Sequence, residues 1–330
     1  MSDDRWIGKN VLITGAGGFI GSHLTEYLLV AGAKVRAFVR YNSRGDPGLL
    51  KYIEDHSQLE IIGGDLRDSD AVNQAVKNSQ IVFHLGALIS IPYSYVHPIE
   101  VVETNIIGTL NLLMACREHA IETLIHASSS EVYGTALSIP INESHPLQGQ
   151  SPYSASKIGA DKLVESFYCS FGLPVVTVRP FNTYGPRQSA RAVIPSIISQ
   201  ALTRKVIRLG NLETRRDFTY VADTISGFVQ AAQADGIYGK VINLGTGTDI
   251  AIGEIADRII QMIGRPVSIS QEMQRMRPEK SEVMRLLSDN RSANTLIHWT
   301  PEVSLEQGLH MTIKWIEEHL DLYNPDRYEF

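Results

Sequence analysis

Short hydrophobic runs and longer amphipathic stretches alternate along the first half of the chain. Runs rich in β-branched residues are each followed by a stretch whose apolar residues recur at helical spacing. The expected strands are NVLITG (10–15), KVRAFVR (34–40), LEIIGGD (59–65), IVFHLGA (81–87), TLIHASSS (123–130), PVVTVRP (174–180) and KVINLGTG (240–247). Repeated alternation of strand and helix is typical of right-handed βαβ units. The pattern predicts an α/β fold with a doubly wound parallel sheet of about seven strands.

The regular alternation of strand and helix patterns ends after residue 180. A loop-rich stretch follows, and from residue 250 onward helical patterns dominate, notably at 252–264 and 304–323. We interpret residues 1–180 as a nucleotide-binding domain and 181–330 as a smaller, mainly C-terminal substrate-binding lobe. Because a segment near 220–247 ends in a strand that returns to the sheet, the two parts are expected to interleave.

Composition and charge narrow the function classes. The chain has 330 residues, of which 43% are hydrophobic, and this is enough to build a globular core. Its net charge is −6 and it has no long Lys/Arg block, which argues against binding to nucleic acid or to a membrane surface. No signal peptide or membrane span is recognised, so a cytoplasmic location is expected. Cys116 and Cys169 lie in helical patterns and are expected to be buried thiols.

A glycine-rich motif, ITGAGGFIGSHL, joins the first strand to the first helix. Gly15, Gly18 and Gly21 have GxxGxxG spacing and enclose Phe19 and Ile20. Glycines are needed where the backbone turns tightly, approaches a pyrophosphate and packs helix against strand. The N-terminus of the following helix would then face the phosphates. The motif indicates a Rossmann-type dinucleotide site.

The end of the second strand bears on the choice of cofactor. An acidic residue there binds the ribose of NAD, whereas a cation accommodates the 2′-phosphate of NADP. The segment VRYNSR places Arg40 there with Arg44 nearby and no acid between them. The sequence favours NADP and leaves NAD open, with a solvated surface charge as the alternative for Arg40.

Residues after the third and fourth strands are expected to complete the cofactor site. Asp65 and Leu66 follow the third strand, where an adenine could be met, although Asp65 also suits a turn. Leu85, Gly86 and Ala87 follow the fourth strand and are expected to line the cofactor.

The helix that begins with SPYSASKIGAD carries an acid/base candidate. Tyr153 and Lys157 stand at i and i+4, so their side chains point the same way. A neighbouring ammonium favours the phenolate and is expected to lower the pKa of Tyr153. With the glycine motif and the row SSSE that follows a strand, the chain resembles the extended short-chain dehydrogenase/reductase family over essentially its whole length.

The resemblance implies roles for that row. In the family, Ser129 would hydrogen-bond the 4-hydroxyl of a sugar and Tyr153 while a nicotinamide accepts a hydride from carbon 4. Nucleotide-sugar 4,6-dehydratases carry a glutamate where this chain has Glu131, because a base must remove the carbon 5 proton before water leaves from carbon 6. A charge at the start of a helix is the alternative for Glu131.

One position departs from part of the family. Dehydratases of dTDP-glucose have an acid where this chain has Ser130, and the Ser-Glu pair is instead similar to GDP-mannose dehydratases and UDP-glucuronate decarboxylases. The segments 145–161 and 179–195 most resemble N-acetylhexosamine dehydratases of legionaminic or pseudaminic acid pathways. We expect a UDP-N-acetylglucosamine 4,6-dehydratase. UDP-glucuronate decarboxylase, nucleotide-sugar 4-epimerase and a non-catalytic, NADP-sensing protein remain as alternatives.

The resemblance also implies a nucleotide-sugar site and a partner. The residues that match the family's substrate contacts are Asn182, Arg187, Arg216, Arg277 and Glu282. Helices near 99–119 and 153–171 would pair with a second copy in a four-helix bundle, giving a homodimer. His84 and His126 lie in apolar strands and are expected to be packed core residues, with no metal bound.

Overall fold

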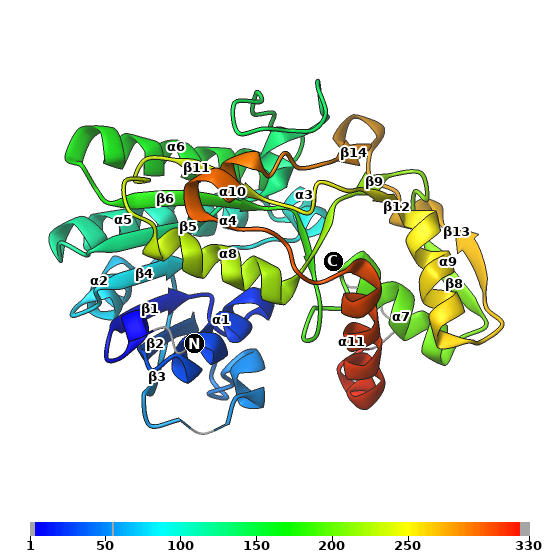
Figure 1. Cartoon of the computed structure of the whole chain (residues 1–330), viewed down its shortest axis with the longest axis horizontal. Helices are drawn as coiled ribbons and strands as arrows, with labels where there is room; N and C mark the ends of the chain where they lie inside the picture. The colour runs from blue at the N-terminus through cyan, green and yellow to red at the C-terminus, as the bar shows by residue number, and fades with distance from the viewer. Residues whose placement is uncertain (1–3, 55, 324–330) are drawn as a thin grey trace.

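A seven-stranded, all-parallel sheet forms the centre of the molecule (Figure 1). The computed structural model describes residues 4–54 and 56–323. The strand order is β3-β2-β1-β4-β5-β6-β11. The bounds are β1 Asn10–Thr14, β2 Lys34–Arg40, β3 Leu59–Gly64, β4 Ile81–His84, β5 Thr123–Ala127, β6 Val175–Pro180 and β11 Val241–Leu244. The predicted strands and the doubly wound Rossmann-type fold are confirmed.

Helices cover both faces of this sheet, because successive strand residues point to opposite sides. In β1, Val11 and Ile13 belong to one hydrophobic cluster, whereas Leu12 between them belongs to another. The first cluster includes side chains of α1 (Phe19–Val30) and α8 (Val221–Gln233). The second includes side chains of α2 (Ser69–Val76), α5 (Gly108–Glu118) and α6 (Pro152–Phe171).

One long helical stretch precedes β5. It runs through α4 (Pro98–Val102) and the π-helical turn η3 (Glu103–Ile107) into α5. Among the described residues this stretch, Pro98–Glu118, is long and apolar enough to cross a membrane by length and composition alone. Its inner face packs against α2 and α6 in the second cluster, which is typical of a core helix. The expected absence of a membrane span and the cytoplasmic location remain predictions.

The second part of the molecule includes the helices α7 Val193–Thr203, α9 Ile252–Ile263 and α11 Leu305–Glu318, which lie at the right of Figure 1. Small sheets pair β7 with β10, β8 with β13, and β9 with β12 and β14. The strands are β7 Asn182–Tyr184, β8 Val206–Leu209, β9 Arg215–Arg216, β10 Phe218–Tyr220, β12 Ile250–Ala251, β13 Ser268–Gln271 and β14 Arg285–Leu286. In the first 180 residues the shorter elements include α3 Ile91–Val96 and the helical turns η2 Gly48–Tyr52 and η4 Ser130–Tyr133. Later in the chain, α10 Arg291–Ile297 packs against α8 and β11, and η6 Glu279–Ser281 is a short helical turn.

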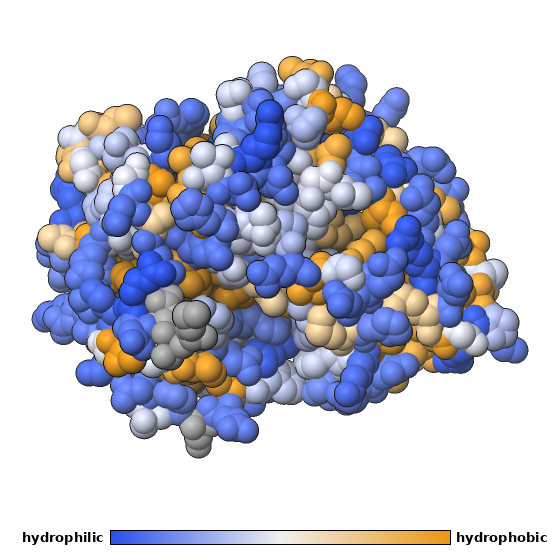
Figure 2. All heavy atoms as spheres, in the orientation of Figure 1, coloured by the Kyte–Doolittle hydropathy of each residue, from blue (hydrophilic) through white to orange (hydrophobic). Residues whose placement is uncertain are grey.

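The two parts are joined by packing as well as by the chain. One hydrophobic cluster contains side chains of β1 and β6 together with those of α7, α9 and α11. The chain also returns to the sheet at β11, beside β6. The domain division near residue 180 therefore stays an interpretation. Figure 2 shows hydrophilic side chains over most of this face of the molecule, with smaller hydrophobic patches between them.

The two cysteines differ in environment. Cys116 is fully buried, and burial raises the pKa of its thiol. Cys169 is exposed, so its predicted burial is wrong. On α6, Val164 and Phe167 point into the core, and a residue two positions after Phe167 lies on the opposite side of the helix.

We predict that Gly308→Ala destabilises the protein. Gly308 lies in α11, and a methyl group there would overlap the buried ring and hydroxyl of Tyr184, which comes from β7. Overpacking of this kind costs about 1–3 kcal/mol, so the thermal midpoint measured by calorimetry should fall. Gly253→Ala in α9 is the matched control, because its methyl group would meet Leu212 at an ordinary 3.5 Å. An equal midpoint for both variants would contradict the close packing of α11.

Candidate active site

A cleft of about 870 Å³ opens at the carboxyl ends of the central strands. It is lined by loops that follow β1, β2, β4, β5 and β6, together with the start of α6. Most of the residues predicted from the sequence lie in its lining: Gly15, Gly18, Phe19, Ile20, Gly21, Arg40, Leu85, Ala87, Ser129, Ser130, Glu131, Tyr153, Lys157, Asn182, Arg187 and Arg277. The fold therefore brings together the residues expected for the dinucleotide and for the chemistry.

The glycine loop leaves room for an anion at the start of α1. Gly15 has φ of +70°, and a Cβ there would lie 2.8 Å from Cα of Gly86, so the loops after β1 and β4 touch. Gly18 is the N-cap of α1, makes no side-chain cap, and is followed by a first turn without an acidic residue. The free N–H groups of that turn and the positive end of the helix favour phosphate. These residues fit a dinucleotide.

Of the residues expected near the adenosine, Arg40 lines the cleft, whereas Asp65 and Leu66 do not. Arg40 is exposed on the cleft and forms an ion pair with Glu100 Oε1 at 3.1 Å. Asp65 accepts hydrogen bonds from the backbone and guanidinium of Arg67, and the Arg67 bond lowers the pKa of Asp65. Leu66 is buried against Gly108. In the described structure neither Asp65 nor Leu66 belongs to the cleft lining, and the contacts of Asp65 fit the turn alternative.

A loop that the sequence reasoning missed closes this end of the cleft. Residues 42–49 fold back because the Asn42 carboxamide accepts hydrogen bonds from the N–H groups of Arg44 and Asp46. The loop then packs so tightly on Gly17 that a Cβ on Gly48 would lie 2.6 Å from the Gly17 carbonyl oxygen. The turn residues in NSRGDPG could have predicted a loop, but no local signal indicated its return to Gly17. Residues 89–92 and 188–192 also line the cleft and were missed.

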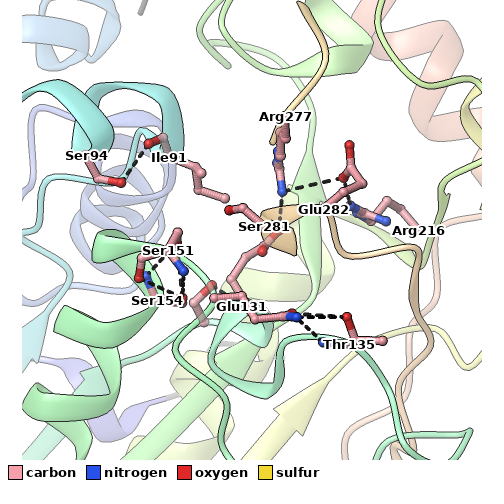
Figure 3. A network of polar contacts seen from close by, with 12 residues as sticks. Ile91, Ser94, Glu131, Thr135, Ser151, Ser154, Arg216, Arg277, Ser281 and Glu282 are labelled. Atoms are coloured by element: carbon pink, nitrogen blue, oxygen red, sulfur yellow. Dashed lines mark hydrogen bonds and ion pairs between the residues drawn. The ribbon is translucent and has the colours of Figure 1, made fainter. Parts of the chain in front are cut away.

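The hydroxyl row after β5 meets the start of α6. Ser129 caps η4 by accepting a hydrogen bond from the N–H of Glu131 at 3.2 Å. Its hydroxyl also lowers the pKa of the Tyr153 phenol, which favours the phenolate. Ser151 and Ser154 form a reciprocal cap that begins α6 (Figure 3). This cap fixes the direction in which Tyr153, in the first turn, enters the cleft.

The protonation of the Tyr153–Lys157 pair differs from the expectation. Burial raises the pKa of Tyr153 to about 12, and the charges of Glu131 and Asp161 act in the same direction. Burial lowers the pKa of Lys157 to about 8, and its ammonium donates to the carbonyl oxygen of Ala127 at 2.8 Å. The predicted lowering of the Tyr153 pKa is therefore wrong, because the loss of solvent outweighs the effect of Ser129, which acts in the opposite direction.

Charged residues from the second part of the molecule reach Glu131. Arg277 Nη1 lies 3.7 Å from Glu131 Oε1 and 4.0 Å from Glu282 Oε1 (Figure 3). Arg216 Nη2 lies 3.7 Å from the same Glu282 oxygen. Burial lowers the pKa of Arg216, while the charge of Glu131 opposes that effect. The predicted substrate residues Arg216, Arg277 and Glu282 thus form one cluster with the candidate base.

Several buried polar atoms at the cleft have no hydrogen-bond partner among the described residues. They are Asn182 Oδ1, Arg187 Nη1, Gln188 Oε1 and Arg277 Nη1. Arg187 is held by an ion pair with Glu26 of α1 at 2.8 Å, which leaves its other nitrogen unpaired. Buried donors of this kind are costly unless a ligand supplies acceptors. Two guanidinium donors in one cleft fit an anionic ligand.

The two strand histidines are packed as expected. His84 hydrogen-bonds Thr14 and Thr109, and burial lowers the pKa of both His84 and His126. In the described ranges 4–54 and 56–323, no group of three His, Cys, Asp or Glu side chains could hold a metal ion. The expected absence of a bound metal stays a prediction.

Comparisons with known proteins agree with this geometry. A family model described as GDP-mannose 4,6-dehydratase matches residues 12–312. The chain is 31% identical to the dTDP-D-glucose 4,6-dehydratase of Mus musculus, over 94% of this chain and 89% of that protein. The structure is similar to DesIV, a dTDP-glucose 4,6-dehydratase from Streptomyces venezuelae with NAD and TYD bound, with a TM-score of 0.87, 26% identity and coverage of 96% and 100% of the two chains. It is also similar to a UDP-N-acetylglucosamine 4-epimerase from Methanobrevibacter ruminantium in complex with UDP-N-acetylmuramic acid, with a TM-score of 0.86, 33% identity and coverage of 95% and 99%.

Proposed function

This chain belongs to the GDP-mannose 4,6-dehydratase family of nucleotide-sugar dehydratases and epimerases, and from that premise we propose that it is a UDP-N-acetylglucosamine 4,6-dehydratase. The observation that carries the proposal is the position of Glu131. Its carboxylate lines the same cleft as Ser129 and Tyr153, beside the cationic Arg277. An epimerase that only removes and returns a hydride needs no base there, whereas dehydration needs one for the carbon 5 proton.

Each proposed catalytic residue would have a separate role in the reaction. Ser129 and Tyr153 would hold the 4-hydroxyl of the sugar, and Tyr153 would take its proton. A bound NAD(P) would supply the hydride acceptor for carbon 4. Glu131 would then remove the proton at carbon 5, which the adjacent carbonyl acidifies, before water leaves from carbon 6. Return of the hydride to carbon 6 and of a proton to carbon 5 would complete the cycle, so that the net change is the loss of one water. Ser130 carries no acid, so Glu131 or water held by Ser130 would protonate the leaving hydroxyl.

Two similarities support UDP-N-acetylglucosamine as the nucleotide-sugar. The sequence resembles N-acetylhexosamine dehydratases of legionaminic and pseudaminic acid pathways, and one similar solved structure is a UDP-N-acetylglucosamine 4-epimerase. Arg216, Arg277, Asn182 and Arg187 would bind the diphosphate, because a guanidinium matches phosphate with charge-assisted hydrogen bonds. Glu282 would contact the nucleoside ribose.

We also propose that NADP is preferred over NAD. Arg40 stands at the end of β2 on the rim of the cleft, where a 2′-phosphate would compete with Glu100 for its guanidinium. One similar solved enzyme has NAD bound, so NAD remains the alternative.

A homodimer is our proposal for the assembly. The helical stretch 98–118 presents Ile99, Val102, Ile107 and Met114 to solvent, and α6 presents Phe171. On 98–118 these side chains recur at helical spacing and lie within one face. A second copy that pairs the same face through a four-helix bundle would remove this apolar surface from water.

The reaction is tested by the mass of the product. Purified protein with NADP or NAD is incubated with UDP-N-acetylglucosamine, its GDP counterpart, UDP-glucuronate and dTDP-glucose. We expect UDP-N-acetylglucosamine to lose one water. Loss of carbon dioxide from UDP-glucuronate would instead indicate a decarboxylase. An unchanged mass with altered NMR signals would indicate an epimerase, and no product from any sugar would favour a non-catalytic protein.

We predict that Glu131→Gln abolishes dehydration without weakening substrate binding. The amide has the same shape but cannot accept the carbon 5 proton, and loss of a general base costs about 10²–10⁴-fold in rate. Because Arg277 loses its ion pair with Glu131, calorimetry should show UDP binding that is equal or tighter. Dehydration at the normal rate would remove Glu131 from the mechanism.

We predict that Arg40→Ala weakens NADP binding by about tenfold and leaves NAD binding nearly unchanged, because only the 2′-phosphate loses a charge-assisted contact. Glu100→Gln is the matched variant of opposite sign, since it frees Arg40 and should strengthen NADP binding. Equilibrium binding followed by cofactor fluorescence measures both. Equal weakening of NADP and NAD by Arg40→Ala would overturn the proposed preference.

A further inference from the structure

A buried carboxylate lies one helical turn behind the catalytic lysine. Asp161 follows Lys157 by four residues on α6 and is 5% exposed. Its oxygens accept a hydrogen bond from Ser128 Oγ at 2.8 Å and lie 3.2 Å from His126 Nε2. Arg179, on β6, donates to Asp161 Oδ2 from Nε at 3.1 Å and from Nη2 at 2.8 Å. Ser128 and Asp161 lie within the segments SSSE and SPYSASKIGAD, but neither is among the site residues predicted from the sequence.

The network separates two cavities. Lys157 lines the catalytic cleft, whereas Asp161 and Arg179 line a second cavity of about 590 Å³ between α6 and β6. Ser128 is the residue between the end of β5 and Ser129, so its bond to Asp161 ties the hydroxyl row to α6. The carboxylate of Asp161 therefore contacts Ser128 of the cleft, although Asp161 itself does not line the cleft.

Lys157 has little else to keep it charged. Its side chain is 4% exposed, and the carbonyl oxygen of Ala127 is the acceptor of its hydrogen bond. A neutral carbonyl does not offset the loss of solvent around an ammonium. Burial lowers the pKa of Lys157 to about 8, and the charge of Asp161 opposes that fall.

The other titratable groups around Lys157 do not replace Asp161. Burial lowers the pKa values of His84 on β4 and His126 on β5, and the charge of Lys157 lowers both further. Neither ring therefore favours the ammonium form of Lys157. Burial raises the pKa of Tyr153, so its phenol offers Lys157 no negative charge at neutral pH. Among the described groups that act on Lys157, Asp161 is the one that favours the ammonium.

Arg179 keeps Asp161 ionised. Burial alone would raise the pKa of Asp161, but the hydrogen bond to His126, the charge of Arg179 and the bond from Ser128 lower it to about 2. Arg179 is held in turn by its bond to the Tyr133 hydroxyl at 2.9 Å, and that hydroxyl donates to Asn243 at 2.7 Å. Asp161 lies one helical turn after Lys157 on α6, whereas Arg179 reaches the carboxylate from β6.

We propose that Asp161 is a positioning residue of this active site: its carboxylate, fixed by Arg179, keeps Lys157 as an ammonium ion and anchors the turn that carries Ser129. The proposal rests on the proposed function only in giving Lys157 its purpose, which is to favour the phenolate of Tyr153. The effect on Lys157 itself can be measured without substrate.

The test is a titration of Lys157 by NMR. Protein labelled with ¹³C at the ε-carbon of lysine gives one resonance per lysine, and Lys157→Met identifies the resonance of interest. In Asp161→Asn, which keeps the shape and loses the charge, the midpoint of this resonance should fall by about one pH unit. An unchanged midpoint would overturn the proposal, whatever reaction the enzyme performs.

Three variants separate charge from packing. Asp161→Glu keeps the charge and should hold the midpoint near that of the natural protein, even where its thermal stability falls. Asp223→Asn removes another buried carboxylate, which accepts the N–H groups of Glu302 and Val303 far from Lys157, and should cost stability without moving the midpoint. Should Asp161→Asn fail to fold, Asp161→Ser is the second neutral variant, because water from the second cavity can hydrate Arg179.

The pH dependence of the reaction rate is a second measurement of the effect of the Asp161 charge. The charge of Asp161 raises the pKa of both Lys157 and Tyr153, so its removal should move the whole pH–rate profile to lower pH. Asp161→Glu should restore the position of the profile. A profile that loses height without moving would indicate a structural role only and would contradict the proposal.

Discussion

The contact between Gly15 and Gly86 is the constraint on which the site depends. A Cβ on Gly15 would lie 2.8 Å from the Gly86 backbone, so the loops after β1 and β4 touch without side chains between them. β1 and β4 are neighbours in the sheet, and β5 follows β4. The glycine contact therefore brings the N-terminus of α1, where phosphate would bind, within one strand of the row Ser129–Glu131. A side chain at either glycine would separate the two halves of the cleft.

A second constraint is the approach of the C-terminal part to the end of β5. Arg216, Arg277 and Glu282 come from segments far along the chain, yet their charged groups gather around Glu131. The hydroxyl of Tyr95, in α3, lies 2.6 Å from that of Ser281, in η6, and this hydrogen bond helps to hold the Arg277 segment over the cleft. The proposed base therefore lies where the loops proposed for the dinucleotide meet the residues proposed to bind the diphosphate.

The sequence predicted the sheet well, because buried parallel strands give short β-branched runs and the glycine spacing has one stringent structural use. It predicted side-chain contacts less well. Asp65 is occupied by Arg67, Arg40 is paired with Glu100, and the 42–49 loop returns to Gly17, none of which leaves a local pattern. Cys169 lies on the outer side of a helix whose amphipathic pattern is weak at its end. The roles of the site residues stay predictions, while the structure shows that most of them line one cleft.

The direction of the Tyr153 pKa shows why i, i+4 spacing alone could not predict the chemistry. The spacing implies an ammonium beside a phenol, but burial acts on both groups and in opposite senses, toward neutral phenol and neutral amine. The pKa values of about 12 for Tyr153 and about 8 for Lys157 leave the ligand-free site with a protonated phenol at neutral pH. The negative charge of Glu131 adds to this, since it too raises the pKa of Tyr153. Positive charge placed beside Tyr153 in the cleft would act in the opposite direction and favour the phenolate.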